Sequence, residues 1–586
     1  MTSSVSIIIV SYFTGPTLWL AISSALAQPE CTEILLVNNG NIPGDEKHLR
    51  ELEAKEPRLK IVEGQGNIGF GKACNLAASQ AIGDYLLLLN PDSMLPGGAI
   101  AQLLAEIATY PENTLAGCFL QNPDGSEQRG GRRALLTPMN GIVESLGFNR
   151  ISKKFENLNF NRLPMPENTH EVPVISGAFM CIAASFYKRL DGFDEDYFLH
   201  MEDTDFCYRV HKAGGKVICI PSVKVMHFRS TSEVASSFIE KQKAKGFILY
   251  LNKHFSEQKL LLSIMRIGIM VRCWLKIVIG TLNRAFVPPM TAKNEIARIA
   301  LLYKLTQFSP QDNSLAGKTI IITGADSQIG MCVVGKALAK GAHVIATYKL
   351  THVAFSHPNL TWRKINFSYK EDIAAFTEIK ADVLIHAAKF ELLEKISSKL
   401  TEQGITRVIA FDSEHIFKKP ESLPEPEVNN IPDMTTLYPN ICYGVGFGSS
   451  IARMADIIRR FGKLVIYKKG SGVRNPVNAQ DIADAAIAII DNPVTYRKTY
   501  NLGGDEFITY HDMLMKLFEY IGKPARLIKI PAFSAILSFL GIIYQLPDLN
   551  ADIALRMNRD LISDNTAAAE DFSYNPRKFL EGDVVI

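Results

Sequence analysis
The first 250 or so residues alternate short apolar runs with amphipathic segments, which is the pattern of an α/β domain. Residues 5–10 form an unbroken β-branched run, residues 33–37 form a second one, and residues 17–27 predict a helix between them. A longer apolar run over residues 84–89 ends in Asn-Pro-Asp, with the carboxylate of Asp92. Because open α/β sheets bind ligands at the carboxyl ends of their strands, polar side chains there are the first candidates for a site.

A second α/β pattern begins near residue 318. Residues 318–349 predict a strand, a turn with two glycines, a helix and another strand. A glycine turn between a strand and a helix is the usual opening of a dinucleotide-binding fold. We therefore expect an α/β domain over residues 1–256, an intervening segment over 257–316 and a Rossmann-type domain over 317–586.

The intervening segment contains the most apolar window of the chain. Residues 260–282 are long enough to span a bilayer. However, Arg266, Arg272 and Lys276 interrupt the window, and with Arg284 they occupy one third of a helical wheel. Charges at mid-membrane cost a few kcal/mol each. The pattern therefore predicts an amphipathic helix on an anionic cytoplasmic leaflet, and the alternative is a helix buried between domains.

Composition indicates a globular cytosolic protein. A content of 47% hydrophobic and 21% charged residues leaves no room for a long disordered tail. The net charge of +3, without a dense basic block, argues against a nucleic-acid binder. The nine cysteines are scattered without metal-binding spacing, which is typical of a reducing compartment. The chain opens directly on a strand, so no signal peptide is expected.

Carboxylates are concentrated among aromatic residues over residues 192–209, GFDEDYFLHMEDTDFCYR. Acids favour the first turn of a helix, so a solvated helix start is the plainest interpretation. Asp92 adds a carboxylate at the end of a buried strand, where it can hold a divalent cation that neutralises a diphosphate. Asn-Pro-Asp-Ser is also good turn chemistry. Taken together with Glu202, Asp203 and the later His227, however, Asp92 favours a metal site.

A glycine-rich turn enters a helix over residues 64–75, GQGNIGFGKACN. Its glycines allow the backbone to approach a ligand closely. Lys72 follows on the helix and is able to reach a phosphate. The alternative is an ordinary turn, but its place before the LLLLNPDS run favours a binding site.

Residues 4 to about 255 resemble an inverting glycosyltransferase of family 2 with the GT-A fold, in the bacterial rhamnosyltransferase-like branch that builds cell-surface polysaccharides. Seven motifs occur in the family's order: VSIIIVSYFTG, EILLVNNGN, GNIGFGKACNLA, LLLLNPDS, VISGAFMCI, GFDEDYFLHMEDTDFCYR and IPSVKVMHFRSTS. The resemblance implies a nucleotide-diphosphate sugar donor, a lipid-linked or polysaccharide acceptor, and Mg²⁺ or Mn²⁺. The branch suggests deoxythymidine-diphosphate rhamnose as the donor.

The resemblance also implies catalytic roles. In an inverting mechanism one carboxylate removes the proton of the acceptor hydroxyl while that oxygen attacks the anomeric carbon. A metal ion on the diphosphate helps it to leave. We expect Asp203 to be the base, with Glu202 as the alternative. Asp205 and Arg209 follow on the same helix and are expected to orient the site.

The remaining roles concern the donor and the metal. Asp92 is the expected metal ligand, and His227, after a strand predicted over residues 216–220, is either a second ligand or a phosphate contact. Many relatives have an Asp where Asn38 stands, which leaves the nucleobase open. The expected donor-binding residues are Ser11, Tyr12, Asn38, Asn39, Gly69, Lys72, Asp92, Ser176 and Gly177.

Residues 317 to about 580 resemble the extended short-chain dehydrogenase/reductase family, which includes NAD-dependent sugar-nucleotide epimerases. The matching stretches are KTIIITGADSQIGMCVVGKALAKGAHVIATYK, DVLIHAAK, VIAFDSEHIF, ICYGVG, RNPVNAQDIADAA, YNLGG and FSYNPRKF. The resemblance implies a Rossmann fold that binds NAD(P). The residues that would hold it are Gly324, Ser327, Gln328, Ile329, Gly330, Lys349, Ala387, Ala388 and Ser413.

This second match departs from the family at its chemistry. Ser327 replaces the middle glycine of GxxGxxG, and Lys349 stands where relatives that bind NAD have an acid, so that NADP is favoured. Ser413 matches the catalytic serine, but Tyr443 is followed at the fourth position by Phe447 instead of a lysine. A tyrosine without that lysine has no means of lowering its pKa for proton transfer. We predict a degenerate domain without redox activity.

Three functions remain open from the sequence. The first is a glycosyltransferase, cytoplasmic and peripheral on the inner face of the cell membrane, with a reductase-derived domain for structure, assembly or nucleotide sensing. The second is a bifunctional enzyme whose C-terminal domain makes the donor by reduction or epimerisation of a sugar nucleotide. The third is a scaffold in which both domains have lost activity, which the carboxylate and histidine set argues against. The oligomeric state is open.

Overall fold

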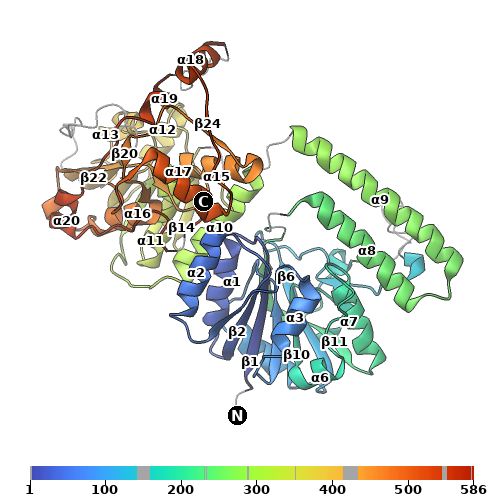
Figure 1. Cartoon of the computed structure of the whole chain (residues 1–586). Helices are drawn as coiled ribbons and strands as arrows, with labels where there is room; N and C mark the ends of the chain where they lie inside the picture. Colours follow the sequence, from blue (N-terminus) through green and yellow to red (C-terminus); the bar gives the residue numbers. More distant parts are fainter. Residues whose placement is uncertain are drawn as a thin grey trace. The chain divides into compact units, whose positions relative to one another are not determined.

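The computed structural model describes residues 3–140, 159–229, 231, 234–286, 290–349, 352–412, 433–543, 551–582 and 584–586. The chain folds into two compact units (Figure 1). The first comprises residues 1–41 and 49–296, and the second comprises residues 42–48 and 297–586.

The first unit is built on one mixed sheet of nine strands. Its strands are β1 (Val5–Ser11), β2 (Cys31–Asn38), β3 (Leu59–Val62), β4 (Tyr85–Leu89), β5 (Ser93–Met94), β6 (Thr114–Gln121), β8 (His170–Glu171), β10 (Phe179–Ala183) and β11 (Lys216–His227). They follow the order β3-β2-β1-β4-β10-β6-β11-β5, and β8 pairs with β11. The pairs from β3 to β4 and the pair β6–β11 are parallel, whereas β10 runs antiparallel between β4 and β6.

Helices and a small ribbon complete this unit. They are α1 (Thr17–Leu26), α3 (Phe70–Ala78), α4 (Ala99–Ile107), η2 (Phe160–Arg162), α6 (Ala184–Arg189), α7 (Glu202–Lys212), α8 (Ser236–His254) and α9 (Lys259–Phe286), with β7 (Arg132–Arg133) pairing β9 (Val174–Ile175). Helix α2 (Pro43–Glu53) is divided between the units, because residues 42–48 belong to the second. Figure 1 shows α9 running alongside α8, and the two helices pack together.

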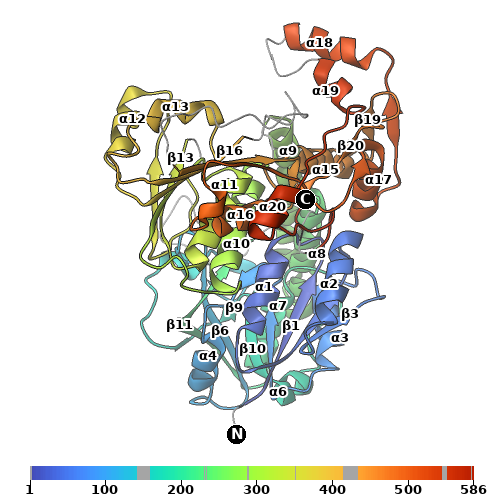
Figure 2. The same ribbon diagram turned by 90° about the vertical axis from the view of Figure 1, so that its left-hand side faces the viewer.

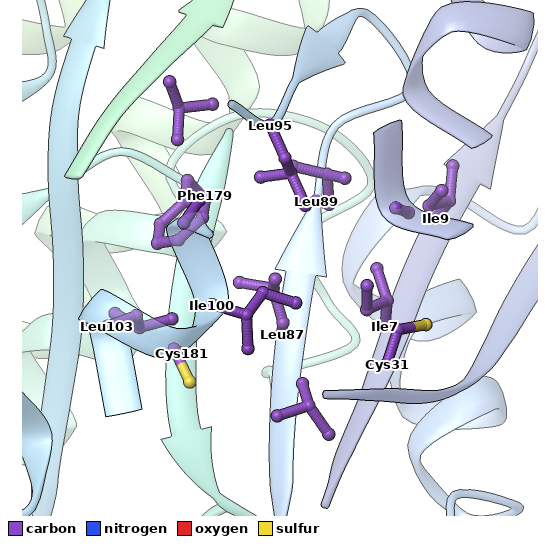
Figure 3. Packing of buried hydrophobic residues seen from close by; sticks show 14 of the residues in the cluster. Ile7, Ile9, Cys31, Leu87, Leu89, Leu95, Ile100, Leu103, Phe179 and Cys181 are labelled. Carbon is purple, nitrogen blue, oxygen red and sulfur yellow. The ribbon is translucent and has the colours of Figure 1, made fainter. Parts of the chain in front are cut away.

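Alternation along the central strands sends apolar side chains to both faces of the sheet. Ile7 and Ile9 of β1 face α1 and α4, where they join Leu87, Leu89 and other buried residues (Figure 3). Ile8 lies on the opposite face, in the cluster that includes α3 and α7. Both faces are covered, which explains why these strands are continuous apolar runs in the sequence.

The strand that leads to His227 is longer than predicted. We expected it to end before Pro221, but β11 continues through Pro221 to His227. Its register against β6 shifts between Ile220 and Lys224. An irregularity of this kind accommodates a proline inside a strand, because the missing N–H falls where the ladder is interrupted.

The second unit has a parallel sheet of seven strands, in the order β14-β13-β12-β15-β16-β17-β22. These are β12 (Thr319–Thr323), β13 (His343–Tyr348), β14 (Leu360–Lys364), β15 (Val383–His386), β16 (Arg407–Phe411), β17 (Asp433–Pro439) and β22 (Thr499–Leu502). In chain order this is the sequence 3-2-1-4-5-6-7, which is the doubly wound dinucleotide-binding arrangement. The predicted Rossmann opening is confirmed.

Shorter elements surround this sheet. The small strand pairs are β18 (Cys442–Tyr443) with β21 (Val477–Asn478), β19 (Leu464–Ile466) with β24 (Leu527–Lys529), and β20 (Val473–Arg474) with β23 (Ile508–Thr509). The helices are α10 (Met290–Gln307), α11 (Gln328–Ala339), α12 (Lys370–Thr377), η3 (Phe390–Leu392), α13 (Glu394–Ser397), α15 (Ser450–Phe461), α16 (Ala479–Ala488), η4 (Pro493–Thr495), α17 (Tyr510–Ile521), α18 (Phe533–Ile543), α19 (Ala551–Arg556) and α20 (Thr566–Phe572). Figure 2 shows α11 and α16 side by side, and they pack closely.

The apolar window of the middle segment forms α9, which is longer than the predicted 260–282. In the part of the chain that the structure describes, no helix combines the length and hydropathy that a bilayer crossing requires.

Candidate active site
Asp92 and His227 meet at one edge of the first sheet. Asp92 follows β4 in a turn, and His227 is the last residue of β11. Oδ1 of Asp92 lies 3.0 Å from Nε2 of His227, and the Thr231 hydroxyl donates to Oδ2 of Asp92 at 3.2 Å. Burial opposes ionisation of Asp92, but His227 and Thr231 outweigh burial and lower the pKa of the carboxyl group. Asp92 is therefore held as a carboxylate.

Gln128 orients the imidazole of His227 from the other side. The amide nitrogen of this buried side chain donates to the His227 carbonyl at 2.8 Å and to the Asn122 side-chain oxygen at 3.1 Å. These two bonds turn Oε1 of Gln128 toward Nδ1 of His227, 2.6 Å away. Nδ1 therefore carries a proton, and Nε2 faces Asp92.

This arrangement fits a divalent cation. A neutral imidazole with its proton on Nδ1 would point its Nε2 lone pair at a carboxylate oxygen 3.0 Å away, which is repulsive unless a second ring proton or a metal cation lies between them. The Asn90 amide lies 3.3 Å from the same nitrogen, and the buried Ser93 hydroxyl has no hydrogen-bond partner. Among the described residues no group of three His, Cys, Asp or Glu residues could hold a metal. A cation on Asp92 and His227 would therefore complete its shell with other oxygen atoms, such as those of a diphosphate.

Glu202 and Asp203 open helix α7 behind a strained turn. His200 and Met201 have φ angles of 70° and 78°, in the left-handed region that side chains rarely adopt. Such strain persists only where the surroundings enforce it. Helix α8 presses on this turn at Gly246, where a Cβ would lie 2.4 Å from the His200 carbonyl oxygen. Packing of α8 thus helps to fix the direction in which α7 begins.

Asp203 is surrounded by donors. The Arg133 guanidinium lies 2.5 Å from Oδ2, and the Gly177 N–H donates to the same oxygen at 3.2 Å. The Thr204 N–H donates to Oδ1 at 2.7 Å. Burial opposes ionisation, but Arg133 and the backbone hydrogen bonds outweigh it and lower the pKa of Asp203. Asp203 is therefore ionised at neutral pH.

Glu202 has the opposite character. Its Oε2 is buried and has no hydrogen-bond partner. Burial and then the neighbouring charge of Asp203 raise the pKa of Glu202 to about 8. The two adjacent carboxyl groups are thus held in different protonation states at neutral pH, which is the arrangement that separates acid and base roles in many active sites.

A backbone connection joins the turn of Asp92 to the carboxylates of α7. The Asn90 N–H donates to the Ala178 carbonyl at 3.0 Å, and Gly177, the preceding residue, donates to Asp203 at 3.2 Å. The hydroxyl of Ser176 accepts from the Ala178 N–H at 3.3 Å. The turn that carries Asp92 is therefore tied to the segment that holds Asp203.

Four expected donor-binding residues lie at the ends of β1 and β2 and beside them. The Ser11 hydroxyl donates to Oδ1 of Asn41 at 3.1 Å, and the Asn41 amide donates to Oδ1 of Asn38 at 2.8 Å. Asn39 donates its amide to the Gly69 carbonyl at 3.1 Å, while its own Oδ1 is buried without a partner. That oxygen can accept a hydrogen bond from a ligand.

Gly69 joins the glycine-rich turn to the carboxylate-bearing loop. Its φ is +89°, and a Cβ there would lie 2.5 Å from the Phe198 carbonyl oxygen. The N–H of Phe70 donates to that same oxygen at 3.0 Å. Only glycine fits this close approach of two backbones.

Two other expected donor-binding residues stand apart from the hydrogen-bonded group. The Tyr12 ring packs edge-on against the Phe13 ring, with centroids 4.8 Å apart. Lys72 lies on the exposed side of α3, where its Nζ is 3.4 Å from a Glu195 carboxylate oxygen. The structure therefore directs Lys72 toward Glu195.

Residues 6–190 match the family described as glycosyl transferase family 2. The N-terminal domain is a family 2 glycosyltransferase domain. The chain is 25% identical over 268 residues to the N-acetylglucosaminyl-diphospho-decaprenol L-rhamnosyltransferase of Mycobacterium tuberculosis, a match that covers 43% of this chain and 86% of that protein. It is 27% identical over 176 residues to the rhamnosyltransferase WbbL of Escherichia coli, covering 28% and 62%. Among solved structures it resembles UDP-glucuronic acid 4-epimerase of Bacillus cereus in complex with NAD, at 14% identity and a TM-score of 0.36, covering 45% and 94%.

The glycosyltransferase domain contains site residues that sequence reasoning missed. Arg133, which pairs with Asp203, and Gln128, which orients His227, both lie in the stretch QRGGRR and its surroundings. Two adjacent arginines are a sequence signal for an anionic partner. The sequence around Arg133 and Gln128, however, does not indicate which residue each of them contacts. His254 was missed as well: its Nε2 lies 2.7 Å from Oδ1 of Asp205, and Oδ2 of the same carboxylate accepts from Arg209 at 2.7 Å.

In the C-terminal domain the glycine turn is present but modified. Gly324 has φ +64°, and a Cβ on Gly330 would lie 2.3 Å from the Gly324 carbonyl oxygen, so both glycines are needed. Ser327 caps α11, and its hydroxyl accepts from the Gly330 N–H at 3.0 Å. One helix N-terminal donor, of the kind that would face a pyrophosphate, is therefore already satisfied. Gln328 and Ile329 form the first turn of α11, and Oε1 of Gln328 is buried without a partner.

The other expected cofactor-binding residues lie at the ends of strands of the second sheet or outside the described residues. Ala387 and Ala388 follow β15 and lie against Gly324. Lys349 follows β13 and is exposed. Ser413 and the stretch 413–432 lie outside the described residues. Tyr443 is buried, donates to the Lys578 carbonyl and accepts from the Leu580 N–H, both at 3.0 Å, which is a structural role.

Proposed function
We propose that the N-terminal domain transfers a sugar from a nucleotide-diphosphate donor to an acceptor hydroxyl, with inversion at the anomeric carbon and with the help of a divalent cation. The observation that carries this proposal is the connection between Asp92 and Asp203. The Asp92 turn and the Asp203 carboxylate are held through adjacent residues, Ala178 and Gly177. A diphosphate bound at the first would therefore present its sugar near the second.

In this scheme Asp203 is the general base. Its carboxylate accepts the proton of the acceptor hydroxyl while that oxygen forms a bond to the anomeric carbon, and the bond to the diphosphate oxygen breaks with the electron pair going to the diphosphate. Arg133 keeps Asp203 ionised and ready to accept. Asp92 and His227 would hold Mg²⁺ or Mn²⁺, which when bound neutralises charge on the leaving diphosphate.

Glu202 is the second candidate base. Its unpartnered oxygen and raised pKa favour it, because a base whose pKa lies near the operating pH has the larger driving force for accepting a proton. As the group is protonated near pH 7, this alternative predicts activity that rises toward pH 8. If Asp203 is the base, the activity should already be at its maximum at neutral pH, because Asp203 is ionised there.

The relatives suggest the substrates. Both are named as rhamnosyltransferases, and the name of one contains a diphospho-decaprenol acceptor. We propose a rhamnose-type donor and a lipid-linked or polysaccharide acceptor, and we propose that the enzyme acts peripherally on the inner face of the cell membrane. Helix α9 supports this placement, because large apolar side chains along it, such as Ile267 and Trp274, are more than half exposed.

For the C-terminal domain we propose a role without redox chemistry. Ser327 occupies a donor at the phosphate-binding end of α11, and Tyr443 is buried in structural hydrogen bonds without a lysine at its fourth following position. The alternative is a bifunctional enzyme that makes its own donor with NAD(P), which the sheet order and the two retained glycines, Gly324 and Gly330, favour. Oxidation of NADPH by a 4-keto sugar nucleotide would establish the alternative.

The metal-dependent transfer is tested with a panel of sugar nucleotides. Nucleoside diphosphate release is measured with Mg²⁺, with Mn²⁺ and with EDTA, for the wild type and for Asp92→Asn. We expect release with one donor, loss in EDTA and a loss of at least tenfold in the variant. Equal release in EDTA would overturn the metal proposal, and no release from any donor would overturn the transferase proposal.

A further inference from the structure
A pair of lysines bridges helices α8 and α9 close to the active site. Lys243 of α8 lies 3.3 Å from a Glu240 carboxylate oxygen, and Lys276 of α9 lies 3.1 Å from the other oxygen of the same carboxylate. Both lysines are more than one third exposed, whereas Glu240 is mostly covered. The three groups carry a net charge of +1, and the two ammonium groups converge on one point that a ligand can reach.

This lysine pair lies beside the turn that leads into the catalytic carboxylates. Gly246, less than one helical turn after Lys243, packs against the carbonyl of His200. The Phe238 ring, also on α8, lies 6.0 Å from the ring of Phe198. Burial and then the charge of Lys243 lower the pKa of His200, while the charge of Asp203 acts in the opposite direction. Lys243 is therefore within electrostatic reach of His200, three residues before Asp203.

Helix α9 carries Lys276 on the side that packs against α8, and a separate exposed apolar surface covers the rest of the helix. Leu262, Met265 and Ile269 pack against the first unit, on the same third of the helix as the basic residues. The rest of the circumference is free of charge and exposed. Its exposed apolar residues are Leu260, Ile264, Ile267, Met270, Val271, Trp274, Leu275 and Ile279.

The charges of α9 select a lipid surface as the occupant of this apolar face. The helix contains five basic residues and no acidic residue, and Arg266 and Arg272 border its exposed apolar face. A second copy docked through the same face would bring two such helices together, with like charges along both edges. An anionic bilayer is instead complementary, since apolar side chains enter the acyl region and the basic edges meet phosphates.

We propose that Lys243 and Lys276 bind the phosphate groups of a lipid-linked acceptor, with Glu240 holding the two ammonium groups until the ligand arrives. The proposal rests on the proposed transferase function and names the acceptor class: a lipid diphosphate whose chain remains in the bilayer at α9. The order along the protein then matches the order along the acceptor. The sugar lies near Asp203, the diphosphate lies on the lysine pair, and the lipid lies along α9.

Direct binding of farnesyl diphosphate tests this site without any need for catalysis. Binding is measured in micelles of a neutral detergent with EDTA present, so that no cation bridges the ligand to Asp92. We expect Lys243→Gln and Lys276→Gln each to weaken binding about tenfold, because each removes one charge-assisted hydrogen bond. Lys241→Gln and Lys245→Gln, on exposed positions of the same helix α8, are the matched controls and should bind as the wild type does.

Two further binding experiments distinguish the diphosphate of the acceptor from the phosphates of bilayer headgroups. Farnesol should bind equally to the wild type and to the double variant, because it carries no phosphate. Sedimentation with phosphatidylcholine vesicles that contain phosphatidylglycerol should require Ile267 and Trp274 but not Lys243 and Lys276. If the lysine variants lose vesicle binding and farnesyl diphosphate binding equally, the lysines bind bulk headgroups and the proposal is wrong. It is also wrong if farnesyl diphosphate binds the double variant as tightly as the wild type.

The outcome is independent of the transferase proposal. Release of nucleoside diphosphate from the donor in water needs Asp92 and Asp203 but not the lysine pair. If donor hydrolysis is normal but the lysine variants bind the lipid diphosphate as the wild type does, only the proposal of the acceptor site is wrong. If no donor is hydrolysed but binding of the lipid diphosphate depends on the two lysines, only the proposed transferase reaction is wrong.

Discussion
Oε1 of Gln128 lies 2.6 Å from Nδ1 of His227, and this contact turns the other ring nitrogen toward Asp92. Replacing Gln128 by Met should therefore weaken Mn²⁺ binding by about 10- to 100-fold, as for other groups that orient a metal-binding histidine. Gln128→Glu keeps an acceptor for Nδ1 and should retain most of the affinity. Titration with Mn²⁺, followed by the paramagnetic signal of free Mn²⁺, measures both.

Gln28 provides the control for this experiment, because it is also a buried glutamine with backbone partners in the same unit. Gln28→Met should lower stability without changing the Mn²⁺ affinity. Equal affinities for the wild type and Gln128→Met would show that the orientation of His227 does not matter for metal binding.

The ion pair between Arg133 and Asp203 should set the acid limb of the pH–rate profile. Arg133 lowers the pKa of Asp203, so its removal raises that pKa, and the fall of kcat/KM on acidification should then begin at a higher pH. We expect the acid limb to move to higher pH in Arg133→Met and to move less in Arg133→Lys. An unchanged acid limb in Arg133→Met would show that another group titrates there.

Glu202 should make the domain less stable as the pH rises. Its pKa in the folded protein is about 8, above the ordinary value of about 4.3, so the folded state binds more protons than the unfolded state between these values. Stability therefore falls with rising pH in this range. Glu202→Gln should remove the effect and should be more stable than the wild type at pH 8 by about 1–3 kcal/mol.

Urea unfolding at pH 5 and pH 8 measures this difference. The advantage of Glu202→Gln should be larger at pH 8 than at pH 5. A constant difference at both values would mean that Glu202 ionises normally in the folded protein, and Glu202 would then lose the property that favours it as an alternative base.

Substitutions at two glycines of the turn before α3 distinguish the cost of backbone strain from the cost of a steric clash. Gly66 and Gly69 both have positive φ, but a Cβ on Gly66 meets nothing within 4 Å, whereas one on Gly69 would lie 2.5 Å from the Phe198 carbonyl oxygen. Gly66→Ala should cost about 1 kcal/mol of stability for its strain alone. Gly69→Ala should cost more, and it alone should raise the KM for the donor. If both variants lost the same stability and had the same KM, the close approach of Gly69 to the Phe198 carbonyl would not matter for donor binding.

The pattern of apolar runs was enough to predict both sheets and the long α9, because continuous β-branched strands and a sustained helical period are local signals. It was not enough for β11, which passes through Pro221 at an irregularity that only pairing with β6 allows. The expected phosphate contact of Lys72 stays a prediction, because spacing does not give the direction of a side chain, and in the structure its Nζ lies 3.4 Å from a Glu195 carboxylate oxygen.

Residues that act on other residues were the hardest to predict. Asp92 and Asp203 stand in motifs, but Arg133 and Gln128 matter through partners that lie 70 and 99 residues away in the chain. The contrast between Glu202 and Asp203 also depends on the fold. The two carboxyl groups are neighbours in sequence, and contacts with Arg133 and with the Gly177 and Thr204 N–H groups make Asp203 a stable carboxylate.

The most direct test of the central claim compares Asp203→Asn with the wild type in the full transfer reaction. The anomeric configuration of the product is determined by NMR, and transfer is measured with Mn²⁺ and the donor selected from the panel. Asp196→Asn is the control, because Asp196 is an exposed acid that pairs with Lys253. We predict an inverted product, a loss of about 10²- to 10⁴-fold in kcat for Asp203→Asn with the fold and the donor affinity retained, and little change in the control. Transfer by Asp203→Asn at the wild-type rate, or a product with retained configuration, would contradict the account.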